Sequence, residues 1–449
     1  MHTNHTHDRA ATSWVASANG HADFPIQNLP YAMFAESAGS PHPAWRSGVA
    51  IGNEVLDLAA LHANKPFTGV AAAALEVAAL ASQTGGLNAF MALGRGAWSA
   101  LRHALFALLR SDADAATQAS VRACLLAQSA VRYKLPSSIA NYTDFYTSIH
   151  HARNVGRISR PDAPPLTPNF QWLPIAYHGR ASSVVVSGTA FKRPMGQALQ
   201  PGGSRPVYGP CTRLDFELEL GAFIGPGNAQ GTPIPLSDAE NHLFGICLLN
   251  DWSARDIQFW EMAPLGPFLG KSFCTSISPW IVTMEALAPY RLPFTRPTND
   301  PQPLAYLDEA GNRAQGVLDI QLEVWLETPL ARAANQAPAR ISATSFKHQY
   351  WTYAQMVAQH TMGGCNLNPG DLLGSGTISG PTLDQAGAII ELTKGGKEPI
   401  TLGSGPAAEQ RAFLLDGDAV ILRGWCERPG AVRIGFGENR GQVLPAAMA

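Results

Sequence analysis

Short apolar runs separated by glycine and proline fill the chain beyond residue 140, and they restrict the possible folds more than any other feature. From Leu318 to Leu326 an apolar residue occupies every second position, which is typical of a half-buried strand. Helical periodicity is sparse in this part of the chain. Because no βαβ rhythm is present, we expect a mainly β (α+β) fold with a mixed, rolled or barrel-like sheet. The runs are VVVSG (184–188), FELELGAFIG (216–225), GICLLND (245–251), PWIVTM (279–284), AIIELT (388–393), AVILRGW (419–425) and VRIGFG (432–437), with helices expected near 238–243, 252–260 and 352–360.

The first 135 residues predict a smaller unit that combines strands and helices. The segment WRSGVAIGNEVLDL is typical of two short strands joined by a two-residue turn at Gly52-Asn53. Helical spacing predicts a helix over 97–110 and a second one over about 114–130. Since 449 residues exceed what one core usually organises, we expect three parts. These are a flexible tail at 1–22, a small β-rich domain with a helical connection at 23–135, and a large domain at 136–449.

The composition excludes several classes of protein. Hydrophobic residues make up 46% of the chain and charged residues 15%, which predicts a well-buried globular protein. The net charge is −2 and no basic stripe is visible, so we expect no nucleic-acid partner. The apolar stretch Val70–Ala81 is short and contains Glu76, and residues 1–20 lack an apolar signal region, so we expect no membrane partner. The six scattered cysteines favour reduced thiols and a cytoplasmic location.

Three histidines, His2, His5 and His7, form a small cluster near the N-terminus. A metal-binding tail is one interpretation of this cluster. A frayed, solvated terminus is the interpretation that we favour, because chain ends are commonly poorly ordered.

Four carboxylates and a histidine are the candidate chemical groups. Asp144, Glu217, Glu219 and Asp251 are oxygen donors of the kind that Ca²⁺ and Mg²⁺ prefer, and His151 follows Asp144 by seven residues. A histidine beside such a cation can activate water, so the residue types point to a metal-assisted hydrolase. Each residue also has a simpler interpretation. Glu217 and Glu219 share one face of a strand that could be solvated, Asp251 could be a helix N-cap, and His151 lies in a polar stretch that we expect to be irregular.

Three polar residues, Arg255, Gln258 and Lys271, share one short window with Asp251. Cations and amides near a metal site suit the stabilisation of an oxyanion, although ordinary charge on a helix face would look the same. In the loop GSGTISG (374–380), glycines bracket Thr377 and allow the backbone to approach a ligand, although a simple turn would also use them.

Several long segments together resemble the fumarylacetoacetase family from about residue 23 to residue 437. The resemblance implies two-domain homodimers, in which a small N-terminal SH3-like β-barrel precedes a large C-terminal mixed β-roll with the active site. The segments are DFPIQNLPYAMF (23–34), NYTDFYTSIHHARNVG (141–156), LPIAYHGRASS (173–183), RLDFELELG (213–221), NDWSARDIQFWEMAPLGPFLGKSF (250–273) and NPGDLLGSGTISGP (368–381).

The resemblance also implies a role for each matching residue. It places Ca²⁺ on Asp144, Glu217, Glu219 and Asp251, and a second, structural Mg²⁺ near Asp251, Lys271 and Thr275. It makes His151 the general base and Glu391 the carboxylate that orients it. It assigns Arg255, Gln258 and Lys271 to an oxyanion hole. The implied substrate contacts are Tyr146, Arg160, Tyr177, Gln258 and Thr377.

The implied reaction is hydrolysis of a carbon–carbon bond in 4-fumarylacetoacetate, a dicarboxylic β-diketone, to fumarate and acetoacetate, the last step of phenylalanine and tyrosine degradation. Three positions depart from the family pattern: Met262 replaces a tyrosine, Cys274 a glycine, and Phe259 a residue expected to be charged. Two alternatives stay open. One is a related isomerase, hydratase or decarboxylase of dioxo acids, and the other is a non-catalytic metal-bound scaffold.

Overall fold

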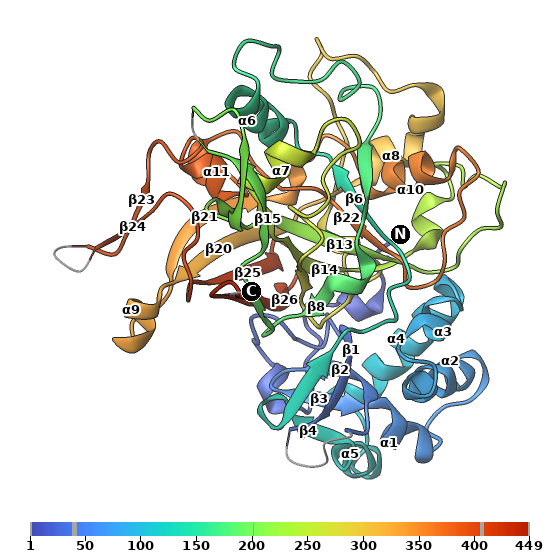
Figure 1. Cartoon of the computed structure of the whole chain (residues 1–449). Coiled ribbons are helices and arrows are strands. Elements are labelled where there is room, and N and C mark those ends of the chain that lie inside the picture. Colours follow the sequence, from blue (N-terminus) through green and yellow to red (C-terminus); the bar gives the residue numbers. More distant parts are fainter. Residues whose placement is uncertain (1, 38–42, 201, 405–407, 448–449) are drawn as a thin grey trace.

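The smaller part of the molecule is a curled antiparallel sheet covered by helices (Figure 1). The structure is a computed structural model that describes residues 2–37, 43–200, 202–404 and 408–447. The strands follow the order β4-β3-β2-β1-β5. The predicted hairpin is confirmed, because Ile51 pairs with Glu54 across the turn at Gly52-Asn53. The strands are β1 (Tyr31–Glu36), β2 (Arg46–Ile51), β3 (Glu54–Asp57), β4 (Leu125–Ala127) and β5 (Val131–Lys134).

Five α-helices accompany this sheet in the described part of the chain. The helix predicted over 97–110 is confirmed as α4. The helix predicted over 114–130 is too long: α5 ends at Arg122, because Leu125–Ala127 form β4 and pair with β3 instead. The pairing of two strands overrides the local helical pattern there. The helices are α1 (Leu58–Ala63), α2 (Gly69–Ala79), α3 (Asn88–Met91), α4 (Arg95–Leu109) and α5 (Ala115–Arg122).

The N-terminal segment is held by contacts with the rest of the protein rather than frayed, which corrects the interpretation of a frayed tail, although His2 and His5 are exposed to solvent. His5–His7 form a short 3₁₀ helix, and Thr6 within it is fully buried. The Asn4 amide donates to Glu285 Oε1 at 2.7 Å, and His7 Nε2 lies 2.8 Å from the Glu285 carbonyl. These contacts compensate the entropy that ordering a terminus costs. Met1 lies outside the described residues.

The larger part contains two mixed sheets that pack face to face. The first has the order β7-β6-β22-β13-β14-β16-β8, with β17 also paired to β14, and the second has the order β21-β20-β25-β26-β9. Parallel pairs, such as β6 with β22, occur among antiparallel ones. The first sheet consists of β6 (Tyr142–Tyr146), β7 (Ile175–Gly179), β8 (Val184–Val186), β13 (Leu218–Ile224), β14 (Leu243–Asp251), β16 (Thr275–Ile277), β17 (Val282–Thr283) and β22 (Leu372–Gly374). The second consists of β9 (Ala190–Lys192), β20 (Gln321–Glu327), β21 (Ala339–Ser345), β25 (Ala419–Cys426) and β26 (Ile434–Leu444).

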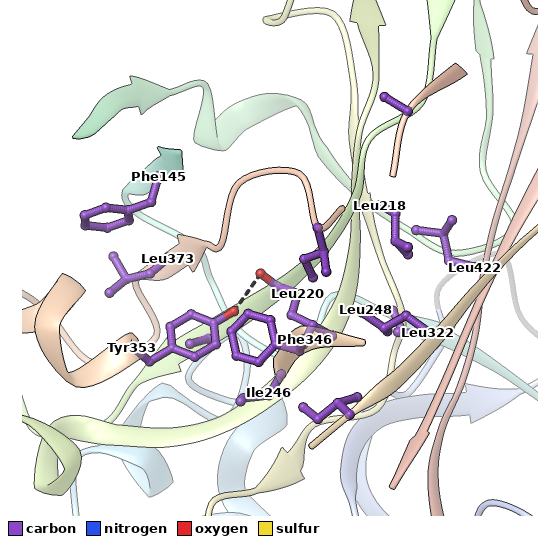
Figure 2. Close-up of a cluster of buried hydrophobic side chains, with 14 of the residues drawn as sticks. Phe145, Leu218, Leu220, Ile246, Leu248, Leu322, Phe346, Tyr353, Leu373 and Leu422 are labelled. Atoms are coloured by element: carbon purple, nitrogen blue, oxygen red, sulfur yellow. Dashed lines mark hydrogen bonds between the residues drawn. The ribbon is translucent and has the colours of Figure 1, made fainter. Parts of the chain in front are cut away.

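The core of the larger part fills the space between these sheets (Figure 2). Leu218 and Leu220 of β13 belong to one buried cluster with Leu322 of β20 and Leu422 of β25. The hydroxyl of Tyr353 donates to the Leu220 carbonyl at 2.7 Å, so the polar end of this ring is also satisfied. The expected mainly β, α+β class is therefore confirmed.

Short helices and two-stranded pairs complete the larger part. Two expectations about them are wrong. The AIIELT run (388–393) contains the helix α11 rather than a strand, and the stretch around His151 is the helix α6 rather than irregular chain. Short apolar runs do not distinguish a strand from a buried helix. The helices are α6 (Ile149–Ser159), α7 (Arg255–Glu261), α8 (Ala310–Gln315), α9 (Pro329–Ala333), α10 (Tyr353–Thr361) and α11 (Ile389–Leu392). The paired strands are β10 (Met195–Leu199) with β11 (Pro206–Pro210), β12 (Leu214–Asp215) with β15 (Ser253–Ala254), β18 (Arg291–Leu292) with β19 (Val317–Leu318), and β23 (Ile400–Leu402) with β24 (Glu409–Arg411).

Two further sequence expectations concern cysteines and membranes. The six cysteines are free thiols, and only Cys365 is exposed. Among the described residues, no helix combines the length and the apolar character that a membrane span requires.

Candidate active site

Four buried carboxylates meet where neighbouring strands of the first sheet end. Asp144 lies on β6, Glu219 on β13, Asp251 at the end of β14, and Glu217 directly before β13. One carboxylate oxygen from each residue lies within 4.8 Å of the others, and all four residues are buried. The alternative of a solvated strand face is therefore excluded for Glu217 and Glu219.

A glycine allows this convergence. Gly374 of β22 pairs with Asp144 on one side and with Gly221 of β13 on the other. A Cβ atom at Gly374 would lie 2.9 Å from Asp144 Oδ1 and 3.1 Å from Glu219 Oε2. The missing side chain thus leaves the space in which the carboxylates meet. The sequence showed this glycine only as part of a turn-like loop, because its partners come from strands far apart in the chain.

The carboxylates fit a divalent cation. Asp144 Oδ1 and Glu219 Oε1 are buried without any hydrogen-bond partner. Burial and the nearby Asp251 raise the pKa of Asp144 well above its usual value, and burial and Asp144 do the same to the pKa of Glu219. The cost of ionising these groups is the cost that a bound cation would remove. An all-oxygen donor set suits Ca²⁺ or Mg²⁺ rather than zinc.

Two cations share the cluster with these carboxylates. The Lys271 ammonium contacts Glu217 and lies 2.5 Å from Asp251 Oδ2, and Arg255 Nη2 lies 2.8 Å from Glu217 Oε1. Burial alone would raise the pKa of Glu217, but Arg255 and Lys271 lower it below its usual range. Gln258, the third residue predicted for this group, accepts from Arg255 Nη1 at 3.3 Å. The structure therefore brings these three residues together beside the carboxylates.

The residues predicted around a second cation also adjoin one another. Thr275 Oγ1 donates to Asp251 Oδ1 at 2.8 Å, on the side of Asp251 that Lys271 does not contact. A cavity of about 200 Å³ lies against Asp251, Lys271 and Thr275.

His151 and Glu391 form a buried pair beside the cluster. Ser148 caps the N-terminus of α6 by accepting from the His151 amide at 3.3 Å, which holds His151 in the first turn. His151 Nδ1 lies 2.6 Å from Glu391 Oε1, and His151 Nε2 lies 3.7 Å from Glu217 Oε1. The imidazole thus bridges α11 and the carboxylate cluster, and only its Nε2 edge faces the cluster.

Two residues that sequence reasoning missed hold Glu391 in place. Ser379 Oγ donates to Glu391 Oε1 at 2.8 Å, and Asn154 Nδ2 donates to Glu391 Oε2 at 2.8 Å. Burial opposes ionisation, but His151 and these hydrogen bonds lower the pKa of Glu391. Asn154 and Ser379 lie in two of the segments that resemble the family, 141–156 and 368–381. Asn154 also sits one helical turn after His151, which is the one signal in the sequence that points to it.

Three of the predicted substrate-binding residues surround the same space. The Tyr146 ring contacts the His151 ring edge-to-face with 5.4 Å between centroids, and the Tyr177 hydroxyl donates to Asp251 Oδ2 at 3.0 Å. Thr377 is buried in the loop after β22, where the Gly376 amide donates to Glu219 Oε2 at 3.0 Å. The glycines of this loop therefore do allow close approach of the backbone to the cluster.

Arg160 and the three departures from the family pattern lie differently. Arg160 is exposed at the C-terminal end of α6 and donates to the Pro165 carbonyl at 3.2 Å, so the structure does not draw it into the cluster. Met262 follows α7 and is 40% exposed, while Phe259 packs partly buried within α7. Cys274 is buried, and its pKa is raised to about 12 by burial and by the nearby Asp251.

Comparisons with known proteins agree with this geometry. The family model described as Fumarylacetoacetase N-terminal matches residues 27–136, and the model described as Fumarylacetoacetate (FAA) hydrolase C-terminal matches residues 140–444. The chain is 48% identical to the fumarylacetoacetase of Homo sapiens over 431 residues, covering 95% of this chain and 97% of that one. It is 46% identical to the fumarylacetoacetase of Oryza sativa subsp. japonica over 437 residues, covering 97% of each chain.

A solved structure shares the fold. The fumarylacetoacetate hydrolase from the psychrophilic Exiguobacterium antarcticum superposes with a TM-score of 0.50 at 17% sequence identity, covering 93% of this chain and 99% of that one. At this identity the likeness concerns the fold alone.

Proposed function

We propose a mechanism for this chain from the premise that it belongs to the fumarylacetoacetate hydrolase family. Its activity is that of a fumarylacetoacetase, a hydrolase that cleaves a carbon–carbon bond of fumarylacetoacetate to give fumarate and acetoacetate. The alternative reactions, isomerisation, hydration or decarboxylation, and a non-catalytic scaffold are not favoured. The observation that carries the mechanism is the buried His151–Glu391 pair, 2.6 Å apart, beside the carboxylate cluster.

The carboxylates of Asp144, Glu217, Glu219 and Asp251 would hold Ca²⁺, since Asp144 and Glu219 offer unpartnered buried oxygens. When bound, the cation supplies a Lewis acid and a template that orients the substrate oxygens. A structural Mg²⁺ would lie near Asp251 and Thr275. Burial disfavours the charged form of Lys271, but Asp251 and Glu217 raise its pKa, so the ammonium stays protonated and this residue would contribute its backbone oxygen.

His151 would act as the general base. Glu391 would accept a hydrogen bond from the Nδ1–H group of neutral His151, so the lone pair on Nε2 would be free to accept a proton from water. The activated water attacks the ketone on the fumaryl side of the substrate. His151 then holds the proton while the carbon–carbon bond breaks, and Glu391 stabilises the imidazolium in its buried position. The electron pair of the broken bond would stay on the acetoacetate part as its enolate, and the imidazolium would return the proton to that carbon, which gives acetoacetate beside fumarate.

Arg255, Lys271 and Gln258 would stabilise the oxyanion that forms during attack. Both Arg255 and Lys271 contact Glu217, and this carboxylate would position them. One such donor is typically worth about 3 kcal/mol of transition-state stabilisation. Tyr146, Tyr177, Gln258 and Thr377 would contact the substrate around this point. Arg160, an exposed side chain at the end of α6, would reach a terminal carboxylate of the substrate.

The wider setting of this activity is also proposed. The reaction would be the last step of phenylalanine and tyrosine degradation in the cytoplasm, and the protein would act as a homodimer. We place the boundary between the two domains at residues 135 and 136, in a stretch without helix or strand between Lys134 and Tyr142.

Product analysis tests the proposed function. The purified full chain is incubated with fumarylacetoacetate and Ca²⁺, and the expected products are fumarate and acetoacetate in equal amounts. His151→Ala, purified in the same way, should release neither product at a comparable rate. An isomer of the substrate as the main product, with its carbon skeleton intact, would contradict hydrolysis.

A further inference from the structure

Asp215 is a buried carboxylate to which the mechanism gives no task. It ends β12, two residues before Glu217, and is fully inaccessible to solvent. Its Oδ2 accepts from Arg255 Nε at 2.8 Å and from the Ile390 amide at 3.2 Å, and its Oδ1 accepts from the Ile389 amide at 2.7 Å. One side chain therefore binds a guanidinium from α7 and the backbone of α11.

The backbone amides that Asp215 binds begin the helix that carries Glu391. This helix has only four residues, Ile389–Leu392, and its N-cap residue, Ala388, has no side-chain oxygen. The first amides of a helix lack partners within the helix and need an acceptor from elsewhere. Asp215 supplies that acceptor from a different part of the chain, as an N-cap side chain would within its own helix.

The guanidinium that Asp215 binds is the proposed oxyanion donor. With Nε bonded to Asp215, the far edge of Arg255 is directed to Glu217, 2.8 Å away, and to Gln258. Because a guanidinium is planar, a hydrogen bond at one edge also fixes the directions of its remaining N–H donors.

We propose that Asp215 is a positioning residue that fixes both halves of the active site: the Arg255 guanidinium on one side and, through the first turn of α11, Glu391 and His151 on the other. This inference rests on the proposed function of Arg255, Glu391 and His151. Displacements of about 1 Å in a catalytic group can cost about 100-fold in rate, so losing this common support should slow the reaction step itself.

Asp418 offers a matched control. It is also fully buried and accepts from a guanidinium, Arg411, at 2.8 and 3.0 Å, and from one backbone amide, that of Leu415, at 2.9 Å. It has the same chemistry as Asp215, but none of its partners belongs to the proposed active site. Asp418→Asn therefore measures the cost of disturbing a buried aspartate–arginine pair alone.

The test compares Asp215→Asn with Asp418→Asn in the full chain, loaded with Ca²⁺. Both variants should lower Tm. Only Asp215→Asn should lower kcat, by about 100-fold, while its KM stays within about threefold, the pattern of an interaction made in the transition state. Its affinity for Ca²⁺, measured by titration calorimetry, should match that of the wild type. Unchanged kcat, a loss confined to KM, or a kcat loss explained by weaker Ca²⁺ binding would each overturn the proposal.

A double-mutant cycle tests the route through α11. If Asp215 acts partly through Glu391, Asp215→Asn combined with Glu391→Gln should lose clearly less activity than the product of the two single losses. Fully additive losses would overturn the proposal. If Asp215→Asn does not fold, Asp215→Glu, which keeps the charge and displaces it by one methylene, replaces it with the same expected kcat and KM pattern. Wild-type protein in the same assay separates the two ideas, because its failure to release fumarate would overturn the proposed function instead.

Discussion

The two faces of β13 present opposite environments within one strand. Leu218 and Leu220 belong to the cluster of buried hydrophobic residues between the two sheets, and the nearby Tyr353 hydroxyl is hydrogen-bonded (Figure 2). Glu219, between them, points to the other side with Glu217, where carboxylates are buried together and two of their oxygens have no partner. The core face is complete without a ligand. The carboxylate face leaves unpartnered oxygens that a bound cation would satisfy.

This difference teaches that stability and function are separable along a single strand. The core face contributes burial of apolar surface, which favours folding. The carboxylate face opposes folding in the absence of a cation, since it keeps ionisable groups out of water. Substitutions on the two faces should therefore have opposite signatures in stability and in activity.

The largest effect is expected on the carboxylate face. Glu219→Gln should abolish Ca²⁺-dependent activity, because it removes one charge from the ligand set. It should also raise the Tm of the metal-free protein, because an amide does not bear the cost of ionising the buried Glu219, whose pKa is raised by burial and by Asp144. Activity assays and thermal melts in a chelator measure the two effects. Asp251→Ala should likewise be inactive, and retained activity in either variant would contradict the metal site.

The next effect concerns the imidazole beside the cluster. His151→Ala and Glu391→Gln should each lower kcat by roughly 10²- to 10⁴-fold, the usual contribution of general-base catalysis. The double variant should lose little more than one of them, because residues that act as a unit are not additive. Steady-state kinetics of the three variants measure this. Losses that multiply in the double variant would show that the residues do not act as a pair.

The core face should show the reverse signature. Leu220→Ala should lower the free energy of unfolding by about 2–5 kcal/mol, as for other buried leucines. At a temperature where the variant is folded, its kcat should stay within about twofold of the wild type, since the Leu220 side chain lies in the hydrophobic core, on the face of β13 opposite to Glu219. Denaturant unfolding and kinetics on the same preparation measure both quantities. A large kcat loss without a stability loss would break the contrast between the two faces.

The contrast should also depend on pH. Burial raises the pKa values of Asp144 and Glu219 above the ordinary values of 3.8 and 4.5 that they regain on unfolding. Above those ordinary values the folded, metal-free protein therefore holds more protons than the unfolded chain, and these two groups make it less stable as pH rises through their raised pKa values. Ca²⁺ binds only the ionised carboxylates, so its stabilisation of the protein should grow with pH.

The measurement is the difference in Tm between Ca²⁺ and chelator at a series of pH values. Taking this difference cancels groups outside the carboxylate cluster, such as His360, whose pKa is lowered by burial and which contributes with the opposite sign. Glu217 and Glu391, whose pKa values are lowered, lose their contribution only below their ordinary value of 4.5. A difference that is flat or decreases with pH would contradict the raised pKa values, and Glu219→Gln should show a smaller slope.

Local pattern made one part of this site predictable. The period of two placed Glu217 and Glu219 on one face, and an apolar run ending at Asp251 placed that residue at a strand end. The features that the sequence did not predict depend on contacts between residues distant in the chain. Gly374 leaves space for the carboxylates because β22 lies between β6 and β13. Asp215 acquires its role because the first amides of α11 bind to it. The predictions of a strand at Glu391 and of a helix that continues to residue 130 are wrong for the same reason, because tertiary packing decides the structure of such short segments.

The smallest effect concerns the edge of the site, at Met262. This residue follows α7, and its amide donates to the Gln258 carbonyl at 3.0 Å, so it lies one turn from a proposed substrate contact. A thioether cannot donate the hydrogen bond that a phenol can, and the family pattern has a tyrosine here. Met262→Tyr should therefore lower KM severalfold and leave kcat unchanged, the signature of binding that is equal in the ground and transition states.

Met362→Tyr is the matched control, because Met362 is 39% exposed against 40% for Met262 and also follows a helix, α10. It should change neither constant. A tenfold rise in kcat for Met262→Tyr without a change in KM, or equal effects of the two substitutions, would contradict this account of position 262.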